Sequence, residues 1–175
     1  MLENKSYFEG KKILVVDDEP DVLESLIELL DIYKIDTASS FEEGKKRLEA
    51  ETYDIAILDI MGVDGFALLK VANKQKIPAL MLTAHGLSEE NLKKSAEEGA
   101  CYYAPKEKMH DIQLFVADVL EAIEKNKSTW EKVFERLADF YDERFYGTNW
   151  REQEQEFWEN KIKNLHSGVC LFAIL

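Results

Sequence analysis

The sequence predicts an α/β protein: a doubly wound five-stranded parallel sheet followed by an α-helical hairpin. Up to residue 125, short runs of aliphatic and β-branched residues alternate with segments whose apolar residues recur at helical spacing. Beyond residue 125 only helical spacing remains, and this part holds 10 of the chain's 19 aromatic residues. Such an aromatic density requires burial. We therefore expect one domain at residues 11–125 and an aromatic-rich helical extension at residues 126–175.

Five short apolar runs predict the strands of the sheet. Near-continuous apolar runs of about four to six residues suit strands that are buried on both faces, as in a parallel sheet. The predicted strands are Ile13–Val16, Ile35–Ala38, Ile55–Leu58, Ala79–Leu82 and Ala100–Tyr103. In such a sheet, right-handed crossovers place the functional crevice at the carboxyl ends of the strands.

Helical spacing between and after these runs predicts five helices. Each predicted helix follows one strand, which gives five β–α units in sequence. The apolar residues that mark the helices are, in order, Val22, Leu26, Leu29 and Leu30; Phe41, Gly44 and Leu48; Phe66, Leu69 and Ala72; Leu92 and Ala96; and Ile112, Phe115, Val116, Val119 and Ile123.

The extension has the pattern of two helices joined by a short turn. Ser128 and Glu131 have capping-box spacing, and Gly147 is a stop signal for the helix that they begin. Its apolar stripe is Trp130, Val133, Phe134, Leu137, Phe140, Tyr141 and Phe145. A second helix is expected from Asn149 to near Gly168, with Trp150, Phe157, Trp158, Ile162 and Leu165 on its apolar side. The sequence leaves three roles open for the apolar tail 169–175, namely a strand added to a sheet edge, a segment that fills a groove on a partner, and a disordered end, and we favour packing against its own chain.

Composition limits the function classes. With 35 acidic residues against 22 basic ones, the chain has a net charge of −13, and phosphate neutralisation by Lys and Arg needs the opposite balance. We therefore expect no nucleic-acid partner. The N-terminus has no signal-peptide pattern, and no apolar run is long enough to span a membrane. Two cysteines suggest reduced thiols, so a cytoplasmic protein is expected.

Acidic and cationic side chains fall where the predicted fold places its crevice. Asp17 and Asp18 follow the first strand, and Asp59 follows the third. Gathered carboxylates repel one another and call for a metal ion or a cationic side chain. Mg²⁺ prefers such oxygen ligands. With Thr83 at the end of the fourth strand and Lys106 after the fifth, the set is suited to phosphoryl transfer.

These residues carry a resemblance to a known family. Residues 11–125 resemble the receiver domain of bacterial two-component response regulators, whose fold is a flavodoxin-like (βα)₅ sheet. Four stretches carry the resemblance in the family's order and spacing. They are Lys12–Pro20 around the acidic pair, Asp54–Met61 around Asp59, Leu80–Ala84 around Thr83, and Gly99–Lys106.

The resemblance implies a role for each matching position. Asp59 is the expected phosphoacceptor, and Mg²⁺ is expected on Asp17, Asp18, Asp59 and the backbone carbonyl of Met61. Thr83, the Ala84 amide and Lys106 are expected to hold the phosphoryl oxygens. In the family, the threonine and an aromatic residue form a conformational switch, which implies Thr83 and Tyr103 here. The family tunes dephosphorylation at the positions of Met61 and His85, and apolar Met61 suggests slow hydrolysis.

The expected function is a phosphorylation-controlled signalling switch, not an enzyme in its own right. A sensor histidine kinase or a phosphotransfer protein would phosphorylate Asp59, and protein–protein contacts would carry the output. The expected partners are a downstream protein and, as a further candidate, a second copy of the chain. The alternative is a receiver-like adaptor that does not cycle, with the helical hairpin as a constitutive protein-binding surface. We expect the extension either to dock on the receiver or to pair two protomers.

Overall fold

A computed structural model describes residues 8–147 and 149–163. Its centre is a parallel sheet of five strands in the order β2-β1-β3-β4-β5. The predicted fold class is therefore confirmed. The strands are β1 (Lys12–Val16), β2 (Lys34–Ala38), β3 (Ile55–Leu58), β4 (Ala79–Thr83) and β5 (Tyr102–Pro105). All residues of β3, β4 and β5 are buried, which is why these segments read as continuous apolar runs.

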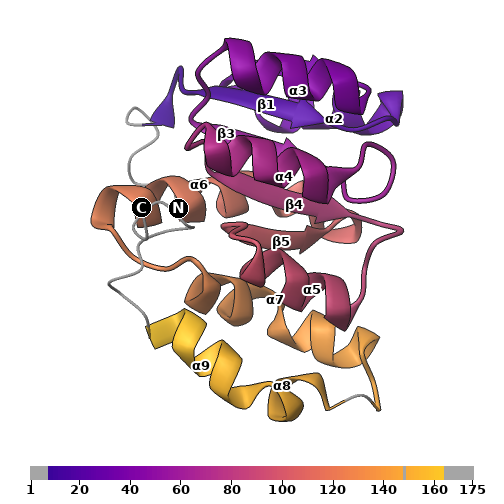
Figure 1. The fold of residues 1–175 in the computed structure, drawn as a ribbon, viewed down its shortest axis with the longest axis vertical. Helices are drawn as coiled ribbons and strands as arrows, with labels where there is room; N and C mark the ends of the chain where they lie inside the picture. Colours follow the sequence, from indigo (N-terminus) through magenta and orange to yellow (C-terminus); the bar gives the residue numbers. More distant parts are fainter. Residues whose placement is uncertain (1–7, 148, 164–175) are drawn as a thin grey trace.

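Helices cover both faces of the sheet (Figure 1). Helices α3, α4 and α5 lie on the near face, while α2 and α6 contact each other. Their bounds are α2 (Pro20–Leu29), α3 (Phe41–Ala50), α4 (Gly65–Lys74), α5 (Glu89–Glu97) and α6 (Ile112–Lys125), and a 3₁₀ turn, η1 (Lys106–Asp111), precedes α6. Local chemistry starts several of them: Pro20 is the first residue of α2, and Ser40 and Ser88 cap α3 and α5 through their hydroxyl groups.

Strand β5 begins two residues later than its apolar run predicts. Ala100 and Cys101 belong to the turn that leaves α5, where Gly99 has a φ of +88° and the Ala100 amide donates to the Ser95 carbonyl. Pro105 closes the strand in register with Thr83. Proline is tolerated there because β5 is an edge strand.

The extension forms helices, as expected, but with different ends. They are α7 (Trp130–Arg144), α8 (Trp150–Gln153) and α9 (Gln155–Lys163). The predicted second helix is interrupted at Glu154, and its expected end near Gly168 lies outside the described residues, as does the tail 169–175.

The predicted capping box does not form at the start of α7. Thr129 is the N-cap residue and makes no side-chain capping bond, and its hydroxyl donates to the Cys101 carbonyl. The Ser128 hydroxyl accepts from the Trp130 amide and donates to the Lys161 carbonyl, so it ties α7 to α9. Tertiary contacts thus replace the local capping pattern.

Helix α7 packs against β5, and α8 and α9 lie beyond it at the bottom of Figure 1. The predicted apolar stripe is the buried face: Trp130, Val133, Leu137 and Tyr141 are buried at helical spacing. Rings of α7, α8 and α9 contact one another, with Phe134 stacked on Trp150 at 5.6 Å between centroids and edge-on to Trp158 at 5.0 Å. The extension therefore docks on the sheet domain of its own chain, which is one of the two expected arrangements.

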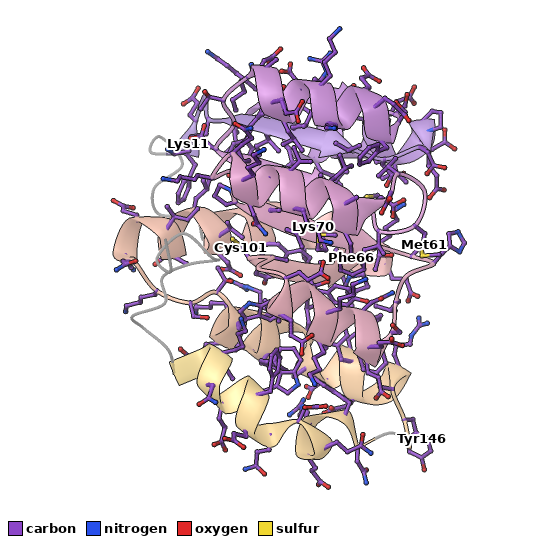
Figure 2. All side chains as sticks on the ribbon, viewed as in Figure 1. Lys11, Met61, Phe66, Lys70, Cys101 and Tyr146 are labelled. Atoms are coloured by element: carbon purple, nitrogen blue, oxygen red, sulfur yellow. The ribbon has the colours of Figure 1, made fainter. Side chains whose placement is uncertain are left out.

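Two further observations concern the environment of the chain. Within residues 8–147 and 149–163, no helix combines the length and the apolar character that crossing a bilayer requires. Cys101, labelled in Figure 2, is disulfide-bonded in the structure. The reduced thiol that the cysteine count suggested is therefore not what the structure has at Cys101.

Candidate functional site

The predicted site residues meet at the carboxyl edge of the sheet. Asp17 directly follows β1, and its amide donates to the Ala38 carbonyl at 3.1 Å. Asp59 directly follows β3, and its amide donates to the Val16 carbonyl at 3.0 Å. Main-chain hydrogen bonds to the neighbouring strands thus hold both aspartates at the ends of adjacent central strands.

Lys106 joins the carboxylates of this edge. Because Pro105 pairs with Thr83, the next residue emerges at the same edge as the two aspartates. The Lys106 Nζ lies 2.7 Å from Asp17 Oδ2 and 3.4 Å from Asp59 Oδ1. It also lies 2.8 Å from Glu19 Oε1. One ammonium group therefore contacts three carboxylates that follow two strand ends, and it neutralises only part of their charge.

Burial makes these charges depend on one another. The side chains of Asp17 and Asp59 are only 2% and 6% exposed. Desolvation raises the pKa of Asp17 above its usual value, and the charge of Asp59 adds to this, while the Lys106 contact and the Glu19 amide oppose it. Although burial alone lowers the pKa of Lys106, its bonds to Asp17 and Glu19 and the nearby charges raise it, so this lysine stays protonated.

The acidic residues fit a divalent cation. Asp17, Asp18 and Glu19 each offer a carboxylate oxygen, and these oxygens lie within 4.8 Å of one another. Asp17 is buried, whereas Asp18 and Glu19 are exposed, so one side of the cluster is open to water. Hard cations such as Mg²⁺ take carboxylates together with several waters. Asp59 is not in this group of three, and it connects to the group through Lys106.

The loop between β3 and α4 fits closely around the site. The Gly62 amide donates to Asp59 Oδ2 at 3.1 Å. A Cβ at position 62 would lie 2.0 Å from Asp18 Oδ1, and a Cβ at Gly65 would lie 2.2 Å from the Asp59 carbonyl oxygen. No side chain fits at position 65, where the obstacle is backbone, whereas a side chain at position 62 would displace the exposed Asp18 carboxylate, so the two glycines let the loop approach both aspartates.

Met61 lies at the rim of this loop. Its side chain is 62% exposed and stands at the edge of the molecule where the strands end (Figure 2). The role of its carbonyl as a metal ligand and its effect on hydrolysis stay predictions.

Thr83 and Tyr103 are connected through Gly86. The Gly86 amide donates to Thr83 Oγ1 at 2.9 Å, and the Tyr103 hydroxyl donates to the Gly86 carbonyl at 2.9 Å. Thr83 and Tyr103 are fully buried, whereas Ala84 and His85 between them are exposed. The two residues predicted to form a switch are therefore hydrogen-bonded to the same residue of the loop after β4.

Sequence reasoning missed two contributors to the site. Glu19 completes the acidic cluster and contacts Lys106, but an acid before the first turn of a helix is ordinarily a helix-terminus residue. Gly62 donates to Asp59 and leaves room for Asp18. Its position three residues after the buried aspartate was the only available signal.

Comparison with known proteins agrees with this geometry. The sequence profile named "Response regulator receiver domain" matches residues 13–117, which is more than half of the chain. The chain belongs to this family. The match ends within α6, so α7, α8 and α9 lie outside the matched part of the receiver domain.

Relatives share the receiver domain but are longer proteins. The Bacillus subtilis alkaline phosphatase synthesis transcriptional regulatory protein PhoP is 44% identical over 85 residues, which are 43% of this chain and 34% of that protein. The Staphylococcus aureus heme response regulator HssR is 46% identical over 76 residues, covering 41% and 34%. The matched stretch thus spans about a third of the curated relatives' length.

Solved structures show the same fold. A CheY-like receiver domain protein from Methanospirillum hungatei is 28% identical, with a TM-score of 0.54, covering 63% of this chain and 96% of that one. The Thermotoga maritima response regulator DrrB, an OmpR/PhoB homologue, is 25% identical, with a TM-score of 0.57, covering 68% and 55%. The receiver domain is therefore a sound basis for proposing a function.

Proposed function

We propose that this receiver domain is a phosphoacceptor response regulator in which Asp59 takes a phosphoryl group in an Mg²⁺-dependent reaction. The observation that carries the proposal is the position of Lys106, whose Nζ lies 2.7 Å from Asp17 and 3.4 Å from Asp59. An ammonium group between a metal-binding acid and the acceptor can pair with a phosphoryl oxygen. The proposed donor is a phosphohistidine on a sensor histidine kinase or a phosphotransfer protein.

In the proposed step, an Asp59 carboxylate oxygen attacks phosphorus, an O–P bond forms, and the P–N bond to the donor histidine breaks. Mg²⁺ held by Asp17 and Asp18 would neutralise charge on the transferred group. Thr83 and the Ala84 amide would donate to its oxygens, and Lys106 would stabilise the acyl phosphate. Positioning and charge neutralisation account for most of such a transfer.

The product would act as a signal. A phosphoryl group adds about −1.5 to −2 charges and strong acceptor oxygens, next to a threonine that is linked to Tyr103 through Gly86. Protein–protein contacts of the receiver would read this change. The family's mode of action also supports a cytoplasmic signalling role for the chain.

Intact-mass spectrometry after incubation with acetyl phosphate and Mg²⁺ tests the proposal. A small donor suits an acceptor whose residue is 5% exposed. The wild type should gain the mass of one phosphoryl group, and Asp59→Asn should gain none. Asp21→Asn is the matched control, since Asp21 is an exposed aspartate in the first turn of α2, and it should behave as the wild type. A wild type that gains no mass would support the non-cycling adaptor instead.

A further inference from the structure

Helix α7 reaches the main chain of the edge strand at two places. The Thr129 hydroxyl donates to the Cys101 carbonyl just before β5, and the Tyr141 hydroxyl donates to the Tyr103 carbonyl within it. Thr129 and Tyr141 are both buried. An edge strand ordinarily offers unpaired backbone groups to other chains, but here the extension of the same chain occupies this edge.

An ion pair anchors the same helix to the receiver. Arg136 donates to both carboxylate oxygens of Asp118 on α6, at 2.6 and 3.0 Å. The Tyr102 hydroxyl of β5 donates to the same carboxylate at 2.9 Å. Asp118 is only 6% exposed, so α6, α7 and β5 meet at a buried charge that has partners from both other elements.

The loop after β4 links the phosphorylation site to Tyr103. Its Gly86 amide binds Thr83 Oγ1, and its Gly86 carbonyl accepts from the Tyr103 hydroxyl. The Ser88 amide in turn donates to the Tyr103 hydroxyl at 3.1 Å. The Tyr103 hydroxyl is therefore hydrogen-bonded to both ends of the 86–88 loop. The main-chain carbonyl of Tyr103 accepts a hydrogen bond from the Tyr141 hydroxyl.

Aromatic packing encloses Tyr103 from the extension side. The rings of Tyr103 and Tyr141 lie 5.9 Å apart, and the ring of Tyr141 lies 6.3 Å from that of Trp150. Tyr103 and Tyr141 are both fully buried. A movement of Tyr103 would therefore disturb Tyr141, and loss of the Tyr141 contact would free Tyr103 to move.

We propose that the docked extension is a regulatory element of the Asp59 site and that Tyr141 is a positioning residue, which acts on Thr83 through Tyr103 and Gly86. This inference rests on the proposed phosphoacceptor function. The direction follows from hydrogen-bond capacity: a threonine hydroxyl has one proton to donate, and the Gly86 amide already occupies an acceptor site of Thr83. The loop that Tyr103 anchors thus holds the Thr83 oxygen as an acceptor, and the single Thr83 proton is available for a phosphoryl oxygen, so we expect the docked extension to favour the phosphorylated state.

Binding of the phosphoryl mimic beryllofluoride in the presence of Mg²⁺ tests this inference. The affinity is measured by ¹⁹F NMR on the full chain, on Tyr141→Phe and on Tyr146→Phe. Tyr146 is the matched control because it is 90% exposed at the turn after α7 (Figure 2). We expect Tyr141→Phe to bind beryllofluoride about fivefold more weakly, within the usual range of coupling between sites, and Tyr146→Phe to bind as the wild type. Equal affinities of the two folded variants would overturn the inference, since a purely structural role would lower stability without changing affinity.

A reciprocal effect on the extension provides a second measurement that needs no variant. All three tryptophans of the chain, Trp130, Trp150 and Trp158, lie in the extension, and each is 5% exposed, so acrylamide quenching of their fluorescence reports on opening of this segment alone. Beryllofluoride should reduce quenching in the wild type, because coupling between two sites is mutual. A wild type that is phosphorylated by acetyl phosphate but shows unchanged quenching overturns only this inference. A wild type that takes up no phosphoryl group overturns the proposed function and this inference with it.

Discussion

Substituting Arg136 should lower the stability of the protein far more than substituting a surface arginine on the same helix. Arg136→Ala leaves the Asp118 carboxylate, 5% exposed, with the Tyr102 hydroxyl but without its cationic partner. Breaking a fully buried ion pair costs about 3–5 kcal/mol. Because the Arg136 side chain is 32% exposed, water replaces part of the lost interaction, and we expect about 2 kcal/mol of lost stability.

Urea unfolding followed by tryptophan fluorescence measures this loss. With a slope of about 2 kcal/mol per molar urea, the midpoint of Arg136→Ala should fall by about 1 M. The matched control is Arg144→Ala on the same helix, because Arg144 pairs with Glu107 of η1 with side chains 46% and 53% exposed. An exposed pair is worth less than about 1 kcal/mol. Equal midpoints for the two variants would refute the argument that the buried pair anchors α7.

Three further predictions concern the site and the packing. Mg²⁺ should raise the melting temperature of the wild type, because a tenfold excess over its dissociation constant adds about 1.4 kcal/mol of stability. The melting temperature of Asp18→Asn should rise less. Equal shifts of the two proteins in calorimetry would count against the metal site. Gly65→Ala should lose about 1–3 kcal/mol in urea unfolding, since its Cβ would lie 2.2 Å from a backbone oxygen; an unchanged midpoint would show that the loop can relax. Leu137 is 2% exposed, so Leu137→Ala should lower the free energy of unfolding by about 2–5 kcal/mol. Ile123 is 38% exposed, so Ile123→Ala should lower it by less than half as much. Equal losses would contradict the packing described.

The sheet and its functional edge were predictable because their signals are local. Strand β3 has the predicted bounds, and Asp59 follows it directly. Strand β5 was placed two residues too early, since the apolar run continues from Ala100 to Pro105 without a break. The turn at Gly99, with its positive φ, and the bond from the Ala100 amide to the Ser95 carbonyl keep the start of this run outside the strand.

The docking of the extension could be predicted only in part. The stripe that contains Val133 and Leu137 predicted which face of α7 is buried. It did not predict the partner, because an apolar stripe fits any apolar surface. The capping pattern at Ser128 failed because the hydroxyls of Ser128 and Thr129 make contacts with residues 33 and 28 positions away. Contacts with such distant partners cannot be recognised from the spacing of neighbouring residues.

The candidate site shows the same division between local and distant information. Asp17, Asp59 and Lys106 could be brought together from strand ends alone, and the structure places them in contact. Glu19 could not be recognised, since it stands at the N-cap of α2 rather than at a strand end, and its contact with Lys106 therefore does not follow from the order of the strands. A carboxylate that gains its role from a distant lysine looks like any solvated acid in the sequence.

Phosphoryl transfer to Asp59 is tested most directly by an experiment that identifies the phosphorylated residue itself. Borohydride reduces an acyl phosphate on aspartate to the corresponding alcohol, so the full chain is treated with acetyl phosphate and Mg²⁺, reduced, digested and mapped by mass spectrometry. We expect a single reduced residue at Asp59, and we expect it to be absent when Mg²⁺ is chelated. Reduction at another acid, or equal reduction without Mg²⁺, would contradict it.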